Sequence, residues 1–365
     1  MEKRKAIIVT WCLTSLNYGE LFQAYAMQSI LKKFQIEPVT VSFLDAATRR
    51  SLKKNTIYKE NFIWHHKFRH FISRYMGAVI QCGDREEVER VSVGSDIYIC
   101  GSDQIWNPGY YSNNSVYTLK FGKKDAKRIA YAPSIGLSRL LSSYEKRMDI
   151  MAADIQKIDY ISVRENTARD ILEARIHRDI QVVLDPTLLI SRKEWRRISS
   201  KRKIRKKYIL VYILGETDIY EGIINQAADK YQADSILWLD MTKGKKLKGK
   251  KVQRIRMASP EDFLNYINMS CAVVTDSFHG LMFSIKFKKP FYILRRKYER
   301  KYLGDDPRLD DILDRLDIKE RIVRCGKDIE KMEPEINYQK INSRINEEKK
   351  KSIEFLKAAL SEEKG

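Results

Sequence analysis

The chain has 365 residues, of which 43% are hydrophobic and 32% charged, and its formal net charge at pH 7 is +21. This length favours two domains, and the apolar content excludes wholesale disorder. No run approaches the roughly 18 apolar residues of a membrane-spanning helix, and the N-terminus lacks the pattern of a signal peptide, so the sequence predicts a cytoplasmic protein.

The five cysteines are scattered and include no Cys-x-x-Cys pair, which is typical of reduced thiols and predicts neither disulfides nor a zinc site. Positive charge gathers at residues 201–207, 243–251 and 295–301. Such a field attracts nucleic acid, an anionic membrane or acidic substrates. The runs carry no nucleic-acid-binding pattern, so no nucleic acid partner is expected. A solvated surface, typical of a lysine-rich organism, is the favoured explanation of the charge, and peripheral contact with an anionic membrane, at its inner face, is left open.

The first elements in chain order predict a parallel α/β sheet. An apolar run at 6–12 indicates a strand, and a polar loop at 14–19 with Asn17 and Tyr18 precedes a helical pattern that ends before Pro38. A second strand at 39–44 completes a right-handed parallel crossover. The Gly-x-Gly-x-x-Gly spacing is absent, so a dinucleotide cofactor is not supported.

Residues 46–92 are expected to form a helical insertion with many charged and aromatic side chains. His66 and His70 lie four residues apart, a spacing that can bind a metal, but no acidic third ligand is nearby. An amphipathic helix is favoured, and no metal site is predicted. A membrane-surface or acceptor-facing role for this segment is left open.

A strand at 97–100 leads into Gly101-Ser102-Asp103-Gln104-Ile105-Trp106-Asn107. The hydrogen-bonding side chains of Asp103 and Gln104, with the flat face of Trp106, suit a sugar. Asp103 at a strand end can also act as a general base for a hydroxyl. The alternative is a capped helix start in which Trp106 anchors the core.

Further strands are expected at 128–132, 160–163 and 181–184, each followed by polar residues at one rim of the sheet. Arg164 follows the second of them, where a guanidinium suits a carboxylate or a phosphate. A structural pair with Glu165 or Asp185 is the alternative.

The polar, basic segment 191–207 is predicted to link an N-terminal domain, 1–190, to a C-terminal domain, 208–330. The second domain restarts the pattern, with strands at 208–214, 235–239, 252–256, 272–275 and 290–294. A helix from about Glu333 to Leu360, within 331–365, is expected to pack back across the junction. The architecture predicted is two Rossmann-like α/β domains in series that face a cleft.

The strand at 272–275 runs into Asp276-Ser277-Phe278-His279-Gly280 and then into a helical pattern. A helix N-terminus at that edge offers backbone N–H groups to an anion. His279 can there pass a proton or hold a phosphate. The alternative is that His279 only caps the turn.

Six motifs occur in a fixed order: Asn17-Tyr18-Gly19 with Gln23-Ala24-Tyr25-Ala26, Gly101 to Asn107, Tyr131-Ala132-Pro133-Ser134-Ile135-Gly136, Ser162-Val163-Arg164-Glu165, Asp185-Pro186-Thr187 and Ser277-Phe278-His279-Gly280. Together they resemble the polysaccharide pyruvyl transferase family, over about residues 6–316. The resemblance implies a GT-B-like pair of Rossmann-like domains, with the acceptor side in 1–190 and the donor side in 208–330. It implies an enzyme that moves pyruvate from phosphoenolpyruvate, with no further cofactor, onto a glycan or lipid-linked sugar of a capsule or exopolysaccharide, as a ketal.

The resemblance suggests a role for each motif residue. His279 and Asp103 are the expected catalytic residues, for proton transfer and for the acceptor hydroxyl. Donor binding is expected from Arg164, Ser277, His279, Gly280 and Arg308, and acceptor binding from Asn17, Tyr18, Asp103, Gln104 and Trp106.

The chain departs from the family at the key turn, where other branches have Arg-Leu-His-Gly and this chain has Ser277-Phe278-His279-Gly280. The lost arginine puts donor binding in question. The alternative function is a nucleotide-sugar-dependent GT-B glycosyltransferase, which needs a diphosphate clamp. An inert glycan-binding protein would keep Trp106 without needing His279 or Arg164.

Overall fold

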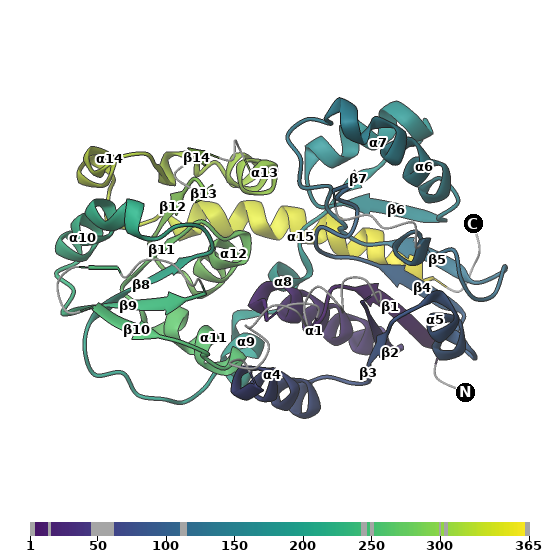
Figure 1. Cartoon of the computed structure of the whole chain (residues 1–365), viewed down its shortest axis with the longest axis horizontal. Helices are drawn as coiled ribbons and strands as arrows, with labels where there is room; N and C mark the ends of the chain where they lie inside the picture. The colour runs from purple at the N-terminus through teal and green to yellow at the C-terminus, as the bar shows by residue number, and fades with distance from the viewer. Residues whose placement is uncertain are drawn as a thin grey trace. The chain divides into compact units, whose positions relative to one another are not determined.

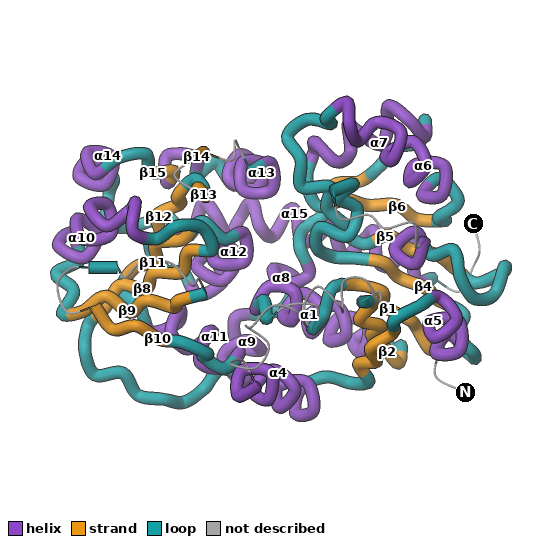
Figure 2. The backbone as a smooth tube through the Cα atoms, in the orientation of Figure 1, coloured by secondary structure: helices purple, strands orange, loops and turns teal. Residues whose placement is uncertain are grey.

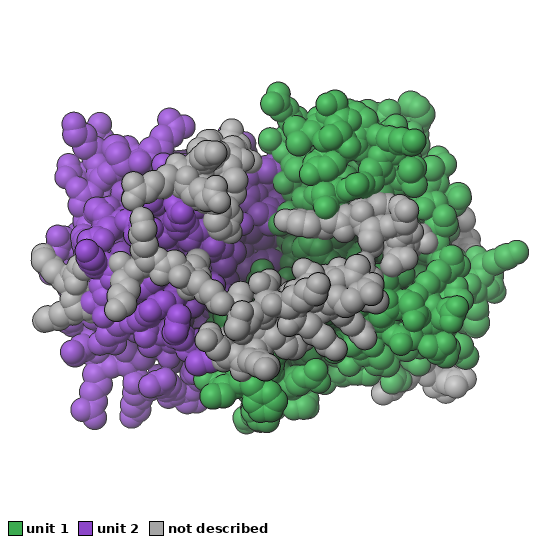
Figure 3. All heavy atoms as spheres, viewed as in Figure 1, with its two compact units in different colours: residues 1–190, 345–365 green, residues 191–344 purple. Residues whose placement is uncertain are grey.

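The computed structural model describes residues 4–13, 16–44, 62–109, 115–241, 247–248, 252–298, 301–302 and 306–361. The loop residues 14–15, the first part of the predicted insertion and most of the basic run at 243–251 lie outside the described residues. The chain divides into two compact units, unit 1 of residues 1–190 and 345–365 and unit 2 of residues 191–344 (Figure 3).

Unit 1 is built on a seven-stranded parallel sheet in the order β3-β2-β1-β4-β5-β6-β7 (Figure 1). Its strands are β1 (Lys5–Thr10), β2 (Glu37–Phe43), β3 (Val79–Cys82), β4 (Ile97–Cys100), β5 (Lys127–Ala130), β6 (Tyr160–Val163) and β7 (Gln181–Val182). The inner strands are buried along most of their length, as expected for parallel strands with helices on both faces.

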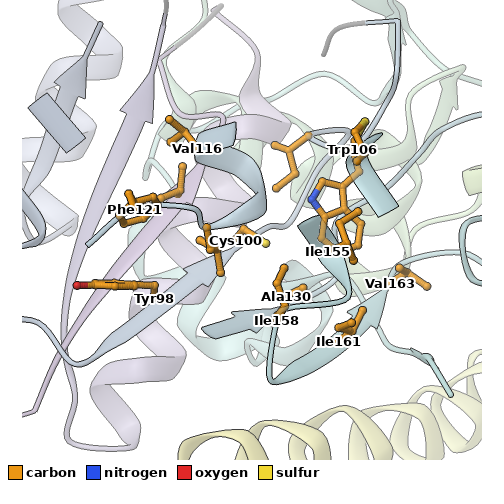
Figure 4. Close-up of a cluster of buried hydrophobic side chains, with 14 of the residues drawn as sticks. Tyr98, Cys100, Trp106, Val116, Phe121, Ala130, Ile155, Ile158, Ile161 and Val163 are labelled. Carbon is orange, nitrogen blue, oxygen red and sulfur yellow. The ribbon is translucent and has the colours of Figure 1, made fainter. Parts of the chain in front are cut away.

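Helices cover both faces of this sheet. They are α1 (Tyr18–Lys33), α4 (Phe62–Tyr75), α5 (Arg85–Ser92), α6 (Glu145–Ile155), α7 (Asn166–Ile176) and α8 (Pro186–Leu189), with single 3₁₀ turns at Ser115–Thr118 and Ser142–Tyr144. Helices α5, α6 and α7 pack on one face through Val88, Met148 and Leu172. Figure 4 shows part of this core, including Trp106 and Ile155.

Unit 2 repeats the design with a six-stranded parallel sheet in the order β10-β9-β8-β11-β12-β15 (Figure 2). Its strands are β8 (Tyr208–Ile213), β9 (Ser235–Asp240), β10 (Val252–Ile255), β11 (Ala272–Thr275), β12 (Phe291–Leu294) and β15 (Ile322–Val323), and a small antiparallel pair joins β13 (Lys297–Tyr298) to β14 (Lys301–Tyr302). The predicted class, two parallel α/β units, is confirmed.

The helices of unit 2 are α9 (Arg192–Ile198), α10 (Glu221–Lys230), α11 (Pro260–Met269), α12 (Phe278–Phe287), α13 (Pro307–Leu316) and α14 (Gly326–Lys331), with 3₁₀ turns at Asp218–Tyr220 and Lys319–Arg321. Helices α10 and α14 pack on one sheet face. Aromatic contacts join α9 to α12 and α11 to β8, through the pairs Trp195–Phe283 and Tyr212–Phe263.

Three predicted segments differ in detail. The insertion is not purely helical, because its described part adds strand β3 between α4 and α5. The predicted linker 191–207 contains helix α9, which buries Trp195 and Ile198. The final helix, α15 (Tyr338–Leu360), starts later than expected, and its residues belong to unit 2 up to Arg344 and to unit 1 from Ile345. Within the described ranges, none of the helices is long and apolar enough to cross a membrane.

Candidate functional site

Some of the motif residues lie where the strand order reverses in each sheet. In unit 1 the reversal lies between β1 and β4, and in unit 2 it lies between β8 and β11. In open α/β sheets such a switch point opens a crevice at the carboxyl ends of the strands, where ligands bind. The loop 101–107 follows β4, and the His279 turn follows β11.

A buried amide ties the two strands together at the switch point of unit 1. The Nε2 group of Gln23 on α1 donates to Thr10 Oγ1 at 2.9 Å, and its Oε1 accepts from the Ser102 backbone N–H at 3.0 Å. Thr10 Oγ1 in turn donates to the Ser102 carbonyl at 2.9 Å. This network fixes the start of the loop that carries Asp103.

Gly101 is required at the head of the same loop. Its φ of +108° is a conformation that side chains rarely adopt, and an added Cβ would stand 2.1 Å from the Tyr131 carbonyl oxygen. Asp103 also has a positive φ, of 76°, which is uncommon outside glycine. Its Oδ1 accepts from the Gln104 backbone N–H at 2.8 Å, so the carboxylate helps to hold its own strained turn.

Arg164 lies among three carboxylates. Its Nη1 donates to Asp185 Oδ2 at 3.1 Å, its Nη2 is 3.7 Å from Asp103 Oδ1, and its Nε is 3.9 Å from Glu165 Oε2. All four side chains are at least nine-tenths buried. One guanidinium therefore faces three acids, and the structural pairing that the sequence left open accounts for its observed contacts.

Hydrogen bonds offset the cost of burying these acids. Asp185 accepts from Ser102 Oγ at 3.0 Å and from Thr187 Oγ1 at 2.6 Å. Glu165 Oε1 accepts from Ser134 Oγ and from the next two backbone N–H groups at 2.8–3.0 Å. The cluster thereby holds the loops after β4, β5 and β6 at one rim of the sheet.

The predicted acceptor residues fall into two environments. Asn17 is half-buried and caps α1, with Oδ1 accepting from the Gly19 N–H at 2.8 Å, and Gln104 is half-buried beside Asp103. Tyr18 is buried against Trp64 and Phe68 of α4, with ring centroids 6.0 and 5.3 Å away.

Trp106 corrects one prediction. The ring is fully buried in the core of unit 1, and its Nε1 donates to the Tyr117 carbonyl at 3.0 Å (Figure 4). No face of the indole is open to a sugar in this structure. The alternative interpretation, a core anchor, is the one that fits.

In unit 2 the carboxylate of Asp276 joins three strand ends. It is fully buried and accepts from the backbone N–H groups of Leu214 at 2.7 Å and Gly215 at 2.9 Å, which follow β8. Its Oδ2 also accepts from Nε of Arg296, which follows β12, at 3.1 Å. Asp276 thus fixes the geometry from which α12 starts.

The N-terminus of α12 is held by side chains from its own turn. Ser277 is the N-cap, and its Oγ accepts from the Gly280 N–H at 3.3 Å. Thr275 Oγ1 accepts from the Ser277 N–H at 3.0 Å and lies so close to Gly280 that an added Cβ would stand 2.4 Å away. His279 sits in this first turn, 6% exposed, with its ring edge-on to Phe278. The backbone N–H groups of such a turn favour an anion.

Arg308 lies in the first turn of α13 and is paired. Its guanidinium donates to both carboxylate oxygens of Asp306, with Nε–Oδ1 at 2.8 Å. Burial raises the pKa of the Asp306 carboxyl, but the charges of Arg308 and Arg296 outweigh it and hold that pKa below its usual range. Arg296 therefore lies near both Asp276 and Asp306 and links the two groups.

The comparisons with known proteins settle the family. The family model for polysaccharide pyruvyl transferases matches residues 17–298. This chain belongs to that family of enzymes. A search of curated proteins finds no relative that matches.

Several solved structures are similar in fold to this chain. The UDP-N-acetylglucosamine 2-epimerase of Rickettsia bellii is similar with a TM-score of 0.52 at 11% identity, and the match covers 98% of this chain and 97% of that one. The UDP-GlcNAc 2-epimerase of Methanocaldococcus jannaschii gives 0.51 at 13% identity, covering 94% and 92%. MnaA of S. aureus, solved with UDP, gives 0.52 at 12% identity, covering 95% and 88%. The fold is GT-B-like, as predicted.

The structure therefore brings the predicted residues of this pyruvyl transferase family member into two groups. Asp103, Gln104 and Arg164 meet in unit 1, and Ser277, His279 and Gly280 meet in unit 2. Sequence reasoning gave no role to Gln23, Asp276 or Arg296. The one signal for Asp276 was its position directly after an apolar strand. Among the residues that the structure describes, no group of three or more His, Cys, Asp or Glu side chains could hold a metal.

Proposed function

We propose that this protein transfers pyruvate from phosphoenolpyruvate to a sugar of a cell-surface polysaccharide or its precursor and forms a pyruvate ketal. Membership of the polysaccharide pyruvyl transferase family carries the proposal. The location of Asp103 after β4 and of His279 after β11, at the switch points of their sheets, supports it, because ligands of open α/β sheets bind there.

In this proposal unit 2 holds the donor. Phosphoenolpyruvate carries a phosphate and a carboxylate, and the first turn of α12 offers backbone N–H groups with His279 beside them. Arg308 adds a positive charge in the same unit, although Nε and Nη2 of its guanidinium also bind Asp306. Gly280 lets the turn pack tightly on Thr275, so the backbone around His279 keeps one geometry.

The chemistry is a double addition at C2 of the enol. A proton adds to the methylene carbon, which becomes a methyl group, and positive charge develops at C2. One sugar hydroxyl attacks C2 and gives up its proton, and the C2–O bond to phosphate breaks. A second hydroxyl then attacks C2 and closes the ketal, and its proton leaves with the phosphate. His279 is assigned the proton delivered to carbon, since an imidazole can donate near neutral pH.

Unit 1 is assigned the acceptor. Asp103 takes the hydroxyl proton, and the amide side chains of Gln104 and Asn17 bind sugar hydroxyls. Arg164, 3.7 Å from Asp103, is assigned the positioning of that carboxylate rather than donor binding, since it is already shared by three acids.

The first test is calorimetric titration of the full chain with phosphoenolpyruvate and, separately, with a uridine diphosphate sugar. His279→Asn is compared with His177→Asn, because His177 is exposed and lies in unit 1. The expected result is that phosphoenolpyruvate binds the wild type and His177→Asn, and that binding to His279→Asn falls at least about tenfold. Binding of the uridine diphosphate sugar alone would replace the proposal by the glycosyltransferase alternative.

A second pair of variants tests Arg308. Arg308→Gln is compared with Arg315→Gln, which removes the same charge from the same helix. Weaker donor binding is expected for the Arg308 variant only. Equal effects in the two variants would show that net charge, and not a contact with the donor, is responsible.

A further inference from the structure

Helix α4 of unit 1 has two unlike faces. Its buried face consists of Trp64, Phe68 and Phe71. Phe71 packs against Phe22 and Tyr25 of α1, with ring centroids 5.7 Å away in both pairs. These aromatic contacts hold α4 against α1, so the side chains on its other face point away from the unit in a defined direction.

The exposed face is basic and contains no acid. Residues 62–75 include Lys67, Arg69 and Arg74 but no aspartate or glutamate. Arg69 and Arg74 are exposed, and among the described residues neither has a carboxylate partner. Most exposed helices of this chain mix both signs, as α6 does with Glu145, Asp149 and Lys146. A solvated helix gains nothing from excluding acids, so the pattern needs another explanation.

Two large apolar side chains lie at the start of the same helix. Phe62 is 76% exposed and Ile63 is 59% exposed, at the start of α4. A single exposed apolar residue is ordinary, but two adjacent ones on an acid-free helix are typical of a helix that lies in the interface of a bilayer. A soluble polyanion would use the cations and leave Phe62 and Ile63 in water.

We propose that the exposed face of α4 binds the surface of an anionic phospholipid bilayer. Phe62 and Ile63 enter the headgroup region, and Arg69 and Arg74 contact lipid phosphates. The net charge of +21 adds long-range attraction toward the same surface. The proposal is independent of which donor the enzyme uses.

The test is flotation of the full chain with two vesicle preparations, one of phosphatidylcholine alone and one of phosphatidylcholine and phosphatidylglycerol in equal parts. Binding is expected to the anionic vesicles and to weaken as salt is raised. Arg69→Gln with Arg74→Gln should lower the partition coefficient about 10- to 30-fold, since each cation near such a surface accounts for about fivefold. Phe62→Ser with Ile63→Ser should lower it about tenfold or more.

Matched controls come from α6 and the residues just after it in the same unit. Lys146→Gln with Lys157→Gln removes the same charge, and Ile150→Ser removes an isoleucine that is 51% exposed. These variants should bind almost as the wild type does. All the substituted residues are exposed, and far-ultraviolet circular dichroism checks that each variant is folded.

Three outcomes would overturn the proposal. The first is no binding to anionic vesicles, and the second is equal losses in the α4 and control variants. The third is binding to heparin that depends on Arg69 and Arg74 while Phe62→Ser with Ile63→Ser has no effect on the vesicles. That last result would assign the face to a soluble polyanion instead.

Discussion

A substitution at Gly280 tests how tightly the His279 turn is built. In most helices a change from glycine to alanine stabilises, by up to about 1 kcal/mol. Here the new Cβ would stand 2.4 Å from Thr275 Oγ1 and 3.1 Å from two carbons of that side chain. Thr275 cannot turn away freely, because its Oγ1 donates to the Tyr212 carbonyl at 2.5 Å and accepts from the Ser277 N–H at 3.0 Å.

The expected magnitude follows from these contacts. Overpacking of this kind costs about 1–3 kcal/mol, so after the helical gain Gly280→Ala should lower the free energy of unfolding by about 1–2 kcal/mol. The control is Gly222→Ala in α10, where an added Cβ meets nothing within 4 Å and a neutral or slightly stabilising change is expected. Urea unfolding followed by circular dichroism should show a midpoint lower by about 0.5–1 M for the first variant only.

A double-mutant cycle assigns the cost to its cause. In a Thr275→Ala background the Oγ1 atom is gone, and Gly280→Ala should become almost as benign as Gly222→Ala. The coupling free energy between the two sites should then be about 1–2 kcal/mol. Equal stabilities of Gly280→Ala and Gly222→Ala in the wild-type background would refute the close approach and, with it, the account of the turn.

Three further predictions concern burial and charge. Because Trp106 is fully buried, Trp106→Phe should lower the free energy of unfolding by about 1–3 kcal/mol and leave the KM for the acceptor unchanged. A raised KM at unchanged stability would instead indicate that the indole contacts the sugar. Asp276→Ala should lower the free energy of unfolding, measured in urea, by about 3–5 kcal/mol. Asp314→Ala should lower it by less than about 1 kcal/mol, because the pair that Asp314 forms with Lys319 is exposed. Similar losses in the two variants would contradict the role given to Asp276. Iodoacetamide should modify exposed Cys325 in the native protein but Cys100 only after unfolding, because Cys100 is buried and burial raises the pKa of its thiol. Mass spectrometry of the native and the unfolded protein after treatment measures which cysteines are modified.

The order of strands and helices could be predicted because parallel strands buried on both faces leave short, continuous apolar runs. The run Tyr208–Ile213 is buried at every position, and its short length and β-branched residues favour a strand over a buried helix. Strand β3 was missed because it lies at the edge of its sheet and two of its four residues are exposed. Helix α9 was missed because only Trp195 and Ile198 are buried among its basic residues.

The candidate site was predictable as a list of residues but not as a set of contacts. Polar residues directly after apolar runs marked Asp103, Arg164 and the His279 turn. Which of them meet depends on the strand order, and the sequence does not reveal that β12 lies beside β11, so the bridge from Asp276 to Arg296 could not be foreseen. For the same reason the sequence offered Arg164 a structural pair with Glu165 or Asp185 but did not reveal its third contact, with Asp103.

Helix α15 determines the order in which the protein can fold during synthesis. Unit 2 is one continuous stretch of chain, but unit 1 includes residues from Ile345 onward. Those residues are part of the packed structure of unit 1, because Leu356 is fully buried and Ser352 Oγ accepts from the backbone N–H of Leu184 at 2.9 Å. The ribosome therefore makes the sheet of unit 1 first. That unit can complete its core only after all of unit 2 has been made, so the surface of unit 1 that α15 covers stays exposed for most of translation.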